Sequence, residues 1–318
     1  MTICPKFIYS GPDIPWMNPQ CLGINTLPPR SNFYTYISEK KALNAEPLDS
    51  PWHLSLDGQW SFKLYQKPSD LEKKIIDLDY NDSGWDFINV PGNWMMQGHD
   101  YPHYTNVQMP FSHQPPKVPK ENPTGVYRTY FILRKGWKER RTVIHFGGVE
   151  SAFFVFCNGK KVGFGKDSRT PVEFDLSPWI KSGKNQLTVV VIRWSDGSFL
   201  EDQDHWWMAG IHRSVYLRST AKTYLEDIFP RVKLNEEFDA GSLEVEVRVN
   251  FTGKIEAGWK IGIKLIDLEE QSVFPSMPLE EIPIAEQTRI NLGHLIRIYK
   301  KVKKPKLWSN EKPNLYTV

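Results

Sequence analysis

Short runs of β-branched and aromatic residues, bounded by Gly, Pro, Asn or Asp, extend over most of the 318 residues. In the clearest run, residues 243–251, every odd position is apolar and every even position is polar. Because successive side chains of a strand point to opposite faces, this run predicts a strand with one face on a core and the other in water. No helical pattern of ten or more residues alternates with these runs, which argues against a parallel α/β sheet or a (β/α)₈ barrel. The sequence therefore predicts an all-β chain.

Further strands are expected from the same composition. They are residues 59–65, 126–133, 141–146, 151–157, 186–194 and 213–218, followed by a strand that carries Trp259, Ile261, Ile263 and Leu265. Asn158-Gly159 lies between two apolar runs and predicts a type I′ hairpin turn. The proline-rich segment 93–125 resists the strand pattern, and a loop of that length in a compact domain is usually functional.

The length of the chain predicts about two domains. Near residues 220–223 an aromatic-rich composition gives way to cleaner alternation with more Lys and Glu, which indicates a boundary. We expect a first domain at 47–220 and a second at 221–318. Residues 1–46 contain six prolines before Arg30 and show no sustained period, so they are expected to form an extension packed on, or draped over, the first domain.

Charge and composition exclude several classes of protein. Forty Lys and Arg against 37 Asp and Glu are interspersed along the chain, which predicts no nucleic-acid surface, and the basic run at 300–306 is expected to be a solvated loop. No stretch approaches the 18 or so apolar residues of a membrane-spanning helix, and the first thirty residues lack the apolar region of a secretion signal. Three cysteines without metal-ligand spacing fit a reducing compartment. We therefore expect a cytoplasmic protein.

The segment 194–207 concentrates four carboxylates, one imidazole and three indoles directly after a predicted strand. Two carboxylates beside aromatic rings suit glycoside hydrolysis, in which one acts as acid and the other as nucleophile or base. The same oxygens suit a hard cation. A third interpretation is a turn whose carboxylates face water and whose tryptophans fill a core. The residue types alone leave these three open.

Nine short motifs occur in a fixed order along the chain. They are GQWSF at 58–62, VPGNW at 90–94, YTNV at 104–107, ENPTG at 121–125, DSR at 167–169, RWSDGS at 193–198, LEDQD at 200–204, KLWS at 306–309 and PNLY at 313–316. Together they closely resemble the amino-terminal part of the large β-galactosidases of glycoside hydrolase family 2. The resemblance covers about residues 47–318.

The resemblance implies a jelly-roll β-sandwich followed by an immunoglobulin-like β-sandwich. In that family a (β/α)₈ barrel with two catalytic glutamates comes next, whereas this sequence ends at Val318, within the expected last strand of the second domain. The implied function is the non-catalytic amino-terminal portion of a retaining β-galactosidase, which hydrolyses terminal β-D-galactosyl residues. The chain alone, without the barrel, is expected to be inactive. The alternatives are a β-glucuronidase-type or β-mannosidase-type member, or a stand-alone carbohydrate-binding module.

The resemblance also implies site residues, although no catalytic one. Asp204 is expected to reach the galactosyl hydroxyls and a sodium ion shared with the missing barrel, and Asn106 to face the sugar. His103, which replaces a usual aliphatic residue, His205 and Trp206 are expected neighbours. Sodium and magnesium are the implied cofactors, and a β-galactoside, the barrel domain and further copies of the full enzyme are the implied partners.

Overall fold

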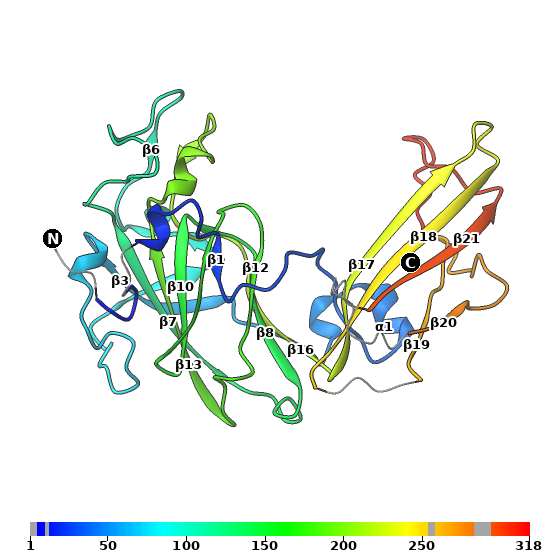
Figure 1. The fold of residues 1–318 in the computed structure, drawn as a ribbon, viewed down its shortest axis with the longest axis horizontal. Helices are drawn as coiled ribbons and strands as arrows, with labels where there is room; N and C mark the ends of the chain where they lie inside the picture. The colour runs from blue at the N-terminus through cyan, green and yellow to red at the C-terminus, as the bar shows by residue number, and fades with distance from the viewer. Residues whose placement is uncertain (1–4, 10–12, 254–257, 283–293) are drawn as a thin grey trace. The chain divides into compact units, whose positions relative to one another are not determined.

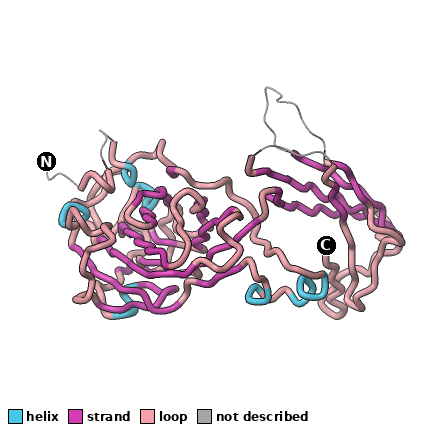
Figure 2. The backbone as a smooth tube through the Cα atoms, turned by 90° about the horizontal axis from the view of Figure 1, so that it is seen from below, coloured by secondary structure: helices cyan, strands magenta, loops and turns pink. Residues whose placement is uncertain are grey.

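The computed structural model describes residues 5–9, 13–253, 258–282 and 294–318. Within them lie 21 strands and one α-helix, so the prediction of an all-β chain is confirmed. The strands and the shortness of the helical segments are visible in Figure 1 and Figure 2. The chain forms two compact units, the first from Met1–Pro29 and Pro47–Ser219, the second from Arg30–Glu46 and Thr220–Val318.

The first unit contains a seven-stranded sheet in which every recorded pair of neighbours is antiparallel. In spatial order its strands are β1 (Gly23–Ile24), β11 (Lys160–Lys166), β10 (Ala152–Cys157), β13 (Lys184–Ile192), β7 (Thr124–Ile132), β3 (Gly58–Tyr65) and β4 (Asp86–Val90). A second sheet has the order β12 (Val172–Asp175), β8 (Arg141–Phe146), β16 (Val215–Thr220) and β2 (His53–Ser55). Both sheets contribute to one apolar core that includes Trp60, Phe146 and Leu217, which makes this unit a β-sandwich.

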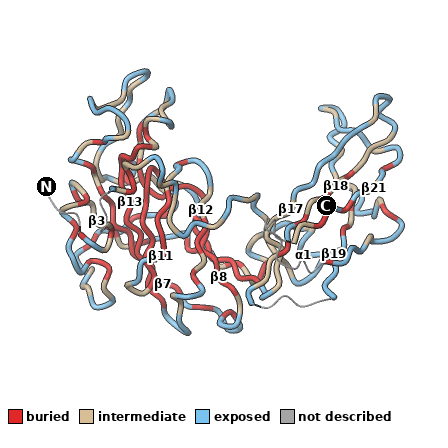
Figure 3. The backbone as a smooth tube through the Cα atoms, in the orientation of Figure 1, coloured by how far each residue is buried: buried red, intermediate tan, exposed pale blue. Residues whose placement is uncertain are grey.

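Strand β13 is buried along all but its first residue, and its course is red in Figure 3. Its Val189 and Val191 enter the core between the sheets, whereas Val190 and Ile192 belong to a second apolar cluster on the outer face. The amino-terminal segment covers that face, because Trp16 lies in the same cluster and packs edge-on against Phe154, 6.1 Å between ring centroids. The outer cluster explains why the sequence of β13 is a nearly continuous apolar run and not an alternating one.

The expected extension 1–46 divides between the units. Of its described residues, those up to Pro29 belong to the first unit, as expected. Residues 30–46 group instead with the second unit, and the expectation that they pack on the first sandwich is wrong for them. They carry helix α1 (Glu39–Asn44), which is capped by Ser38, and Glu39 pairs with Lys264 at 2.6 Å. A polar six-residue helix has too few apolar residues for its packing partner to be predicted from periodicity.

The second unit is built on the sheet β17 (Thr223–Leu234), β18 (Ala240–Phe251) and β21 (His294–Lys303), with the pair β19 (Lys260–Gly262) and β20 (Leu279–Glu281). The alternation predicted at 243–251 is confirmed, since its odd positions from Leu243 to Val249 are buried. The strand predicted around Trp259 is shorter than expected, although Ile263 and Leu265 do enter the core.

The basic run at 300–306 was wrongly assigned entirely to a loop. Lys300, Lys301 and Lys303 belong to strand β21, where Ile298 and Val302 face the core. Lys301 and Lys303 are exposed, whereas Lys300 is half-buried on the same side of the strand as Ile298 and Val302, so a lysine at a core-side position interrupts the apolar period of two.

The Asn158-Gly159 hairpin is confirmed: both residues have positive φ, 50° and 73°, as a type I′ turn requires. Five 3₁₀ turns and five further pieces of strand complete the described secondary structure. They are η1 (Pro15–Met17), η2 (Pro47–Asp49), η3 (Pro68–Asp70), η4 (Trp94–Gln97), η5 (Asp196–Phe199), β5 (Gly92–Asn93), β6 (His103–Tyr104), β9 (Val149–Glu150), β14 (Trp206–Trp207) and β15 (Gly210–Ile211). None of the helices in the described ranges has the length and apolar character needed to cross a membrane.

Candidate functional site

Two loops that are distant in sequence meet at one edge of the first unit. Strand β6 comes from the proline-rich loop and β14 from the acidic segment, and they pair antiparallel with Tyr104 opposite Trp206 and His103 opposite Trp207. The motifs YTNV and LEDQD are thereby brought together, about 100 positions apart in the chain. Because side chains alternate along a strand, Tyr104 and Trp206 lie on one face of the pair and His103 and Trp207 on the other.

The exposed face carries Asp204, Tyr104 and Trp206. The Tyr104 hydroxyl donates to Asp204 Oδ1 at 2.7 Å, and its ring centroid lies 5.6 Å from that of Trp206. The two rings are 51% and 55% exposed, and Asp204 is exposed as well. The hydrogen bond to Asp204 raises the pKa of the Tyr104 phenol, so the phenol remains a donor at neutral pH. Asp204 Oδ2 accepts no hydrogen bond within the described residues, which leaves it available to a hydroxyl group.

The opposite face is a packed core. Trp207 is 2% exposed and donates its indole N–H to Thr105 Oγ1 at 2.8 Å, and its ring lies 5.4 Å from that of Trp194. Asn122 is 1% exposed and bonds both the main-chain N–H and the carbonyl of Trp194, each at 2.9 Å. Trp194 and Trp207 therefore pack within the fold, and Trp206 is the indole exposed on the Asp204 face.

His205 links the exposed face to buried charges. Its Nδ1 lies 2.9 Å from the Trp206 carbonyl and therefore carries the proton, so Nε2 accepts from Arg169 Nη2 at 3.3 Å. Arg169 also pairs with Glu150 at 3.2 Å. Burial raises the pKa of Glu150 to about 7 against the attraction of Arg169, and the nearby Glu201 raises it further.

The carboxylates of the acidic segment have separate roles. Asp196 accepts from Lys166 with both oxygens at 2.8 Å, and both side chains are buried. Glu201 accepts from the main chain of Ser168 at 2.7 Å. Asp202 Oδ1 is buried, with no hydrogen-bond partner among the described residues. Of the four, Asp204 alone combines exposure with a free oxygen, and Asn106, two residues beyond β6, is likewise exposed and without a hydrogen bond in the described chain.

Two contributors to the site were not predicted individually. Tyr104 and Arg169 both occur in the quoted motifs, yet the sequence gives no reason to place Tyr104 beside Asp204 or Arg169 beside His205. These contacts join residues 100 and 36 positions apart. A pattern of period two or 3.6 carries no information at such separations.

Replacing Asp204 by Asn in the 318-residue chain is expected to change the free energy of unfolding by no more than about 0.5 kcal/mol, because its charge is already in water. Denaturant unfolding measures this. Asp196→Asn is the matched control and should cost clearly more, since Lys166 would keep a buried charge without its counter-ion. A large loss for Asp204→Asn would show that Asp204 is a structural residue.

The sequences of both units match models of a known protein family. Residues 54–221 match the family model described as glycosyl hydrolases family 2, sugar binding domain, and residues 223–318 match that of glycosyl hydrolases family 2. The chain belongs to glycoside hydrolase family 2. It is 40% identical over 307 residues to a β-galactosidase of Psychromonas ingrahamii and 39% identical over 310 residues to one of Vibrio cholerae. Each alignment covers 95% of this chain and 29% of the relative, so the chain spans less than a third of the length of these curated relatives.

Solved structures of this family share the fold. A β-glucuronidase of Bacteroides uniformis superposes with a TM-score of 0.64 at 19% identity, covering 83% of this chain and 29% of that one. One from an uncultured Clostridium species gives 0.61 at 22% identity, covering 85% and 43%. At these identities the likeness shows the fold alone. The chain is thus the amino-terminal, two-sandwich region of a family 2 glycoside hydrolase, as the motifs predicted.

Proposed function

We propose that this chain is the non-catalytic front of a retaining β-galactosidase that hydrolyses terminal β-D-galactosyl residues. The observation that carries the proposal is 40% identity, over 95% of the chain, to a protein named β-galactosidase. The exposed Asp204 agrees with it, because a carboxylate with one free oxygen can accept from the hydroxyls of a sugar held in a neighbouring domain. The Asn106 amide offers both a donor and an acceptor to the same sugar.

Hydrolysis with retention needs two carboxyl groups about 5–5.5 Å apart on either side of the glycosidic bond. We assign both to a catalytic barrel outside this chain, because Asp196 and Glu201 are bound within the fold. The chain alone is accordingly expected to be inactive. In the complete enzyme Asp204 and Asn106 orient the sugar, and Trp206 and Tyr104 offer flat apolar surface to it.

Sodium is proposed as an ion that Asp204 shares with the barrel. The residues fit this role in part: Asp204 Oδ2 is one free carboxylate oxygen, and no group of three His, Cys, Asp or Glu in the described ranges could hold a metal ion by itself. Bound there, the ion would supply positive charge for a sugar hydroxyl. We also propose, from the resemblance and the composition of the sequence, that the full enzyme uses magnesium, assembles into a homo-oligomer and is cytoplasmic.

The glucuronidase alternative gains no support from the solved structures, because identities of 19% and 22% show only the fold. A stand-alone sugar-binding module would bind galactosides without any barrel. Both alternatives predict a different outcome from the experiment below.

The test is a chimera in which this chain replaces the matching 29% of the Psychromonas β-galactosidase. The chimera should hydrolyse a chromogenic β-galactoside and not the β-glucuronide, and the 318-residue chain alone should hydrolyse neither. Asp204→Asn in the chimera should lower kcat/KM by about 100-fold, since contacts to the sugar hydroxyls tighten toward the transition state.

An Asp204→Asn chimera with unchanged kinetics, or turnover by the chain alone, would overturn the proposal. Lys67→Gln, a surface change in the same domain, is the control and should leave the kinetics unaltered.

A further inference from the structure

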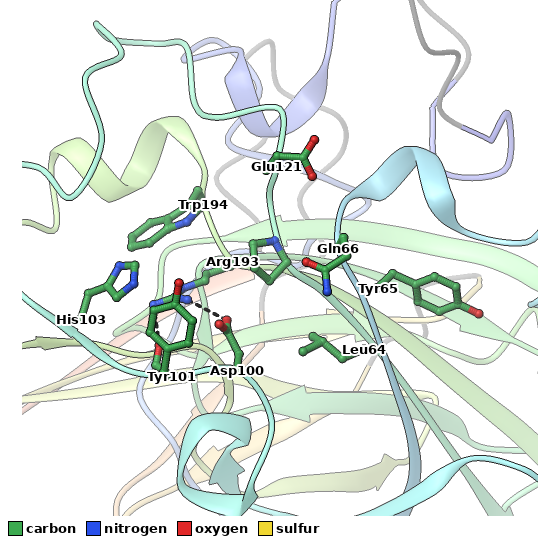
Figure 4. Close-up of a pocket in the computed structure, with 10 residues that line it drawn as sticks. Leu64, Tyr65, Gln66, Asp100, Tyr101, His103, Glu121, Arg193 and Trp194 are labelled. Atoms are coloured by element: carbon green, nitrogen blue, oxygen red, sulfur yellow. Dashed lines mark hydrogen bonds and ion pairs between the residues drawn. The ribbon is translucent and has the colours of Figure 1, made fainter.

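A cavity of about 360 Å³ opens beside the β6–β14 pair, on the side of His103. Figure 4 shows Tyr101, His103 and Trp194 on one side of it and Leu64 and Gln66 on the other. Its volume lies within the range of about 300–1,000 Å³ typical of small-molecule sites. His103 and Tyr104 are neighbours on a strand and point to opposite faces, so the cavity does not include the exposed Asp204 face.

One wall of the cavity is aromatic. His103 lies 4.9 Å from Tyr101 and 6.4 Å from Trp194 between ring centroids, the second pair being stacked with an interplanar angle of 27°. Tyr101 is 65% exposed, although its ring is large and apolar. A flat aromatic wall that remains open to solvent suits a ligand with an apolar face of C–H groups.

Several polar groups around this wall have hydrogen-bonding atoms without a partner among the described residues. Asp100 Oδ2 accepts from Arg193 Nη1 at 2.6 Å, whereas Oδ1 has no partner among the described residues. Neither ring nitrogen of His103 is hydrogen-bonded in the described chain, and its Nδ1 is buried. Gln66 is exposed, with an amide that likewise makes no hydrogen bond there. Of this set His103 Nδ1 is the buried atom, and since buried polar groups are nearly always paired, it points to a missing partner.

The charges of the cavity are balanced. Arg193 is 2% exposed and forms an ion pair with Asp100, and Glu121 pairs with Lys67 at 3.1 Å. Burial, followed by the positive charge of Arg193, lowers the pKa of His103, which leaves the imidazole uncharged at neutral pH. A charged ligand would therefore lose its hydration without gaining a counter-ion.

We propose that this cavity is a second saccharide site, which binds one uncharged pyranose unit with its C–H face on Tyr101 and His103 and its hydroxyls on Asp100 Oδ1, Gln66 and His103. The hydroxyl groups of a sugar both donate and accept, as this set of partners requires. The site goes beyond the proposed function, because it needs neither Asp204 nor a catalytic barrel.

The experiment titrates the 318-residue chain, labelled with ¹⁵N, with methyl β-D-galactopyranoside and methyl β-D-glucopyranoside. We expect shifts of the His103 ring and Trp194 indole signals and a Kd in the millimolar range. D-Glucuronate should bind at least about fivefold more weakly, because its carboxylate meets Asp100 and Glu121. His103→Ala should raise the Kd at least about tenfold, and Gln66→Ala, at an exposed position, should raise it without affecting the fold.

Asp204→Asn is the control for the proposed function and should change this Kd less than about twofold. The inference is overturned if no shifts occur at about 100 mM sugar, or if His103→Ala and Gln66→Ala leave the Kd unchanged. It is also overturned if Asp204→Asn, and not His103→Ala, abolishes binding. Kinetic loss in the Asp204→Asn chimera tests the other face, so either proposal can fail without the other.

Discussion

Glu173→Gln is expected to reduce the free energy of unfolding by about 3–5 kcal/mol, the loss typical of a broken buried ion pair. Glu173, on β12, is 6% exposed and accepts from Arg218 Nε at 3.1 Å and Nη2 at 2.9 Å. His145 Nδ1 lies 3.1 Å from the same carboxylate. Without the negative charge, the Arg218 guanidinium, which is 9% exposed, stays in the sheet with no counter-ion.

Denaturant unfolding of the 318-residue chain measures this loss. Glu121→Gln is the control, since that carboxylate is 71% exposed and its pair with Lys67 should contribute less than about 1 kcal/mol. The double variant Glu173→Gln, Arg218→Met removes both charges and should recover part of the stability, because the unpaired charge is what costs free energy. Equal losses for the single and double variants would contradict this explanation.

Glu150→Gln is expected to stabilise the chain at high pH. The folded-state pKa of Glu150 is about 7, against 4.5 for a free side chain, so between these values the folded state binds more protons than the unfolded state. The stability of the native chain therefore falls as pH rises from about 4.5 to 7, by about 3 kcal/mol at 1.36 kcal/mol per pH unit. Glutamine resembles the protonated carboxyl and avoids this loss, while Arg169, its partner, is partly exposed and can stay solvated.

The measurement is the difference in unfolding free energy between Glu150→Gln and the native chain at pH 5 and pH 8. The variant should gain about 2–3 kcal/mol more at pH 8 than at pH 5. Glu121→Gln, at an exposed carboxylate, should show a much smaller change. A pH-independent difference for Glu150→Gln would show that Arg169 holds the carboxylate ionised throughout.

Local pattern was sufficient for most of the fold. The strand at 243–251 was predicted because a single buried face imposes a period of two, and the Asn158-Gly159 turn because a type I′ hairpin needs positive φ at both residues. The pattern failed at β21, where Lys300 interrupts the apolar period of two, and at residues 30–46, which group with the second unit although their six-residue helix has no buried residue.

The candidate site was predicted only in part. The motifs indicated Asp204 and Asn106 as residues that face a sugar; both are exposed in the structure, and their contact with a sugar stays a prediction. They gave no indication that His103 faces a cavity, that Trp207 is buried while Trp206 is not, or that Glu150 carries a raised pKa. His103, Trp207 and Glu150 all belong to strands of two residues, and the environment of each side chain depends on the face of the strand to which it points.

The sequence by itself determined the all-β class and the alternating faces of the long strands, because these depend on residue types at short spacing. Its nine motifs carry the resemblance to the family. The tertiary structure alone decided that β6 pairs with β14, which sets Tyr104 against Asp204 and turns His103 toward Arg193. The physical reason is range: periodicity and turn chemistry act over a few residues, whereas pairing between loops 100 residues apart follows from the free energy of packing the whole sandwich.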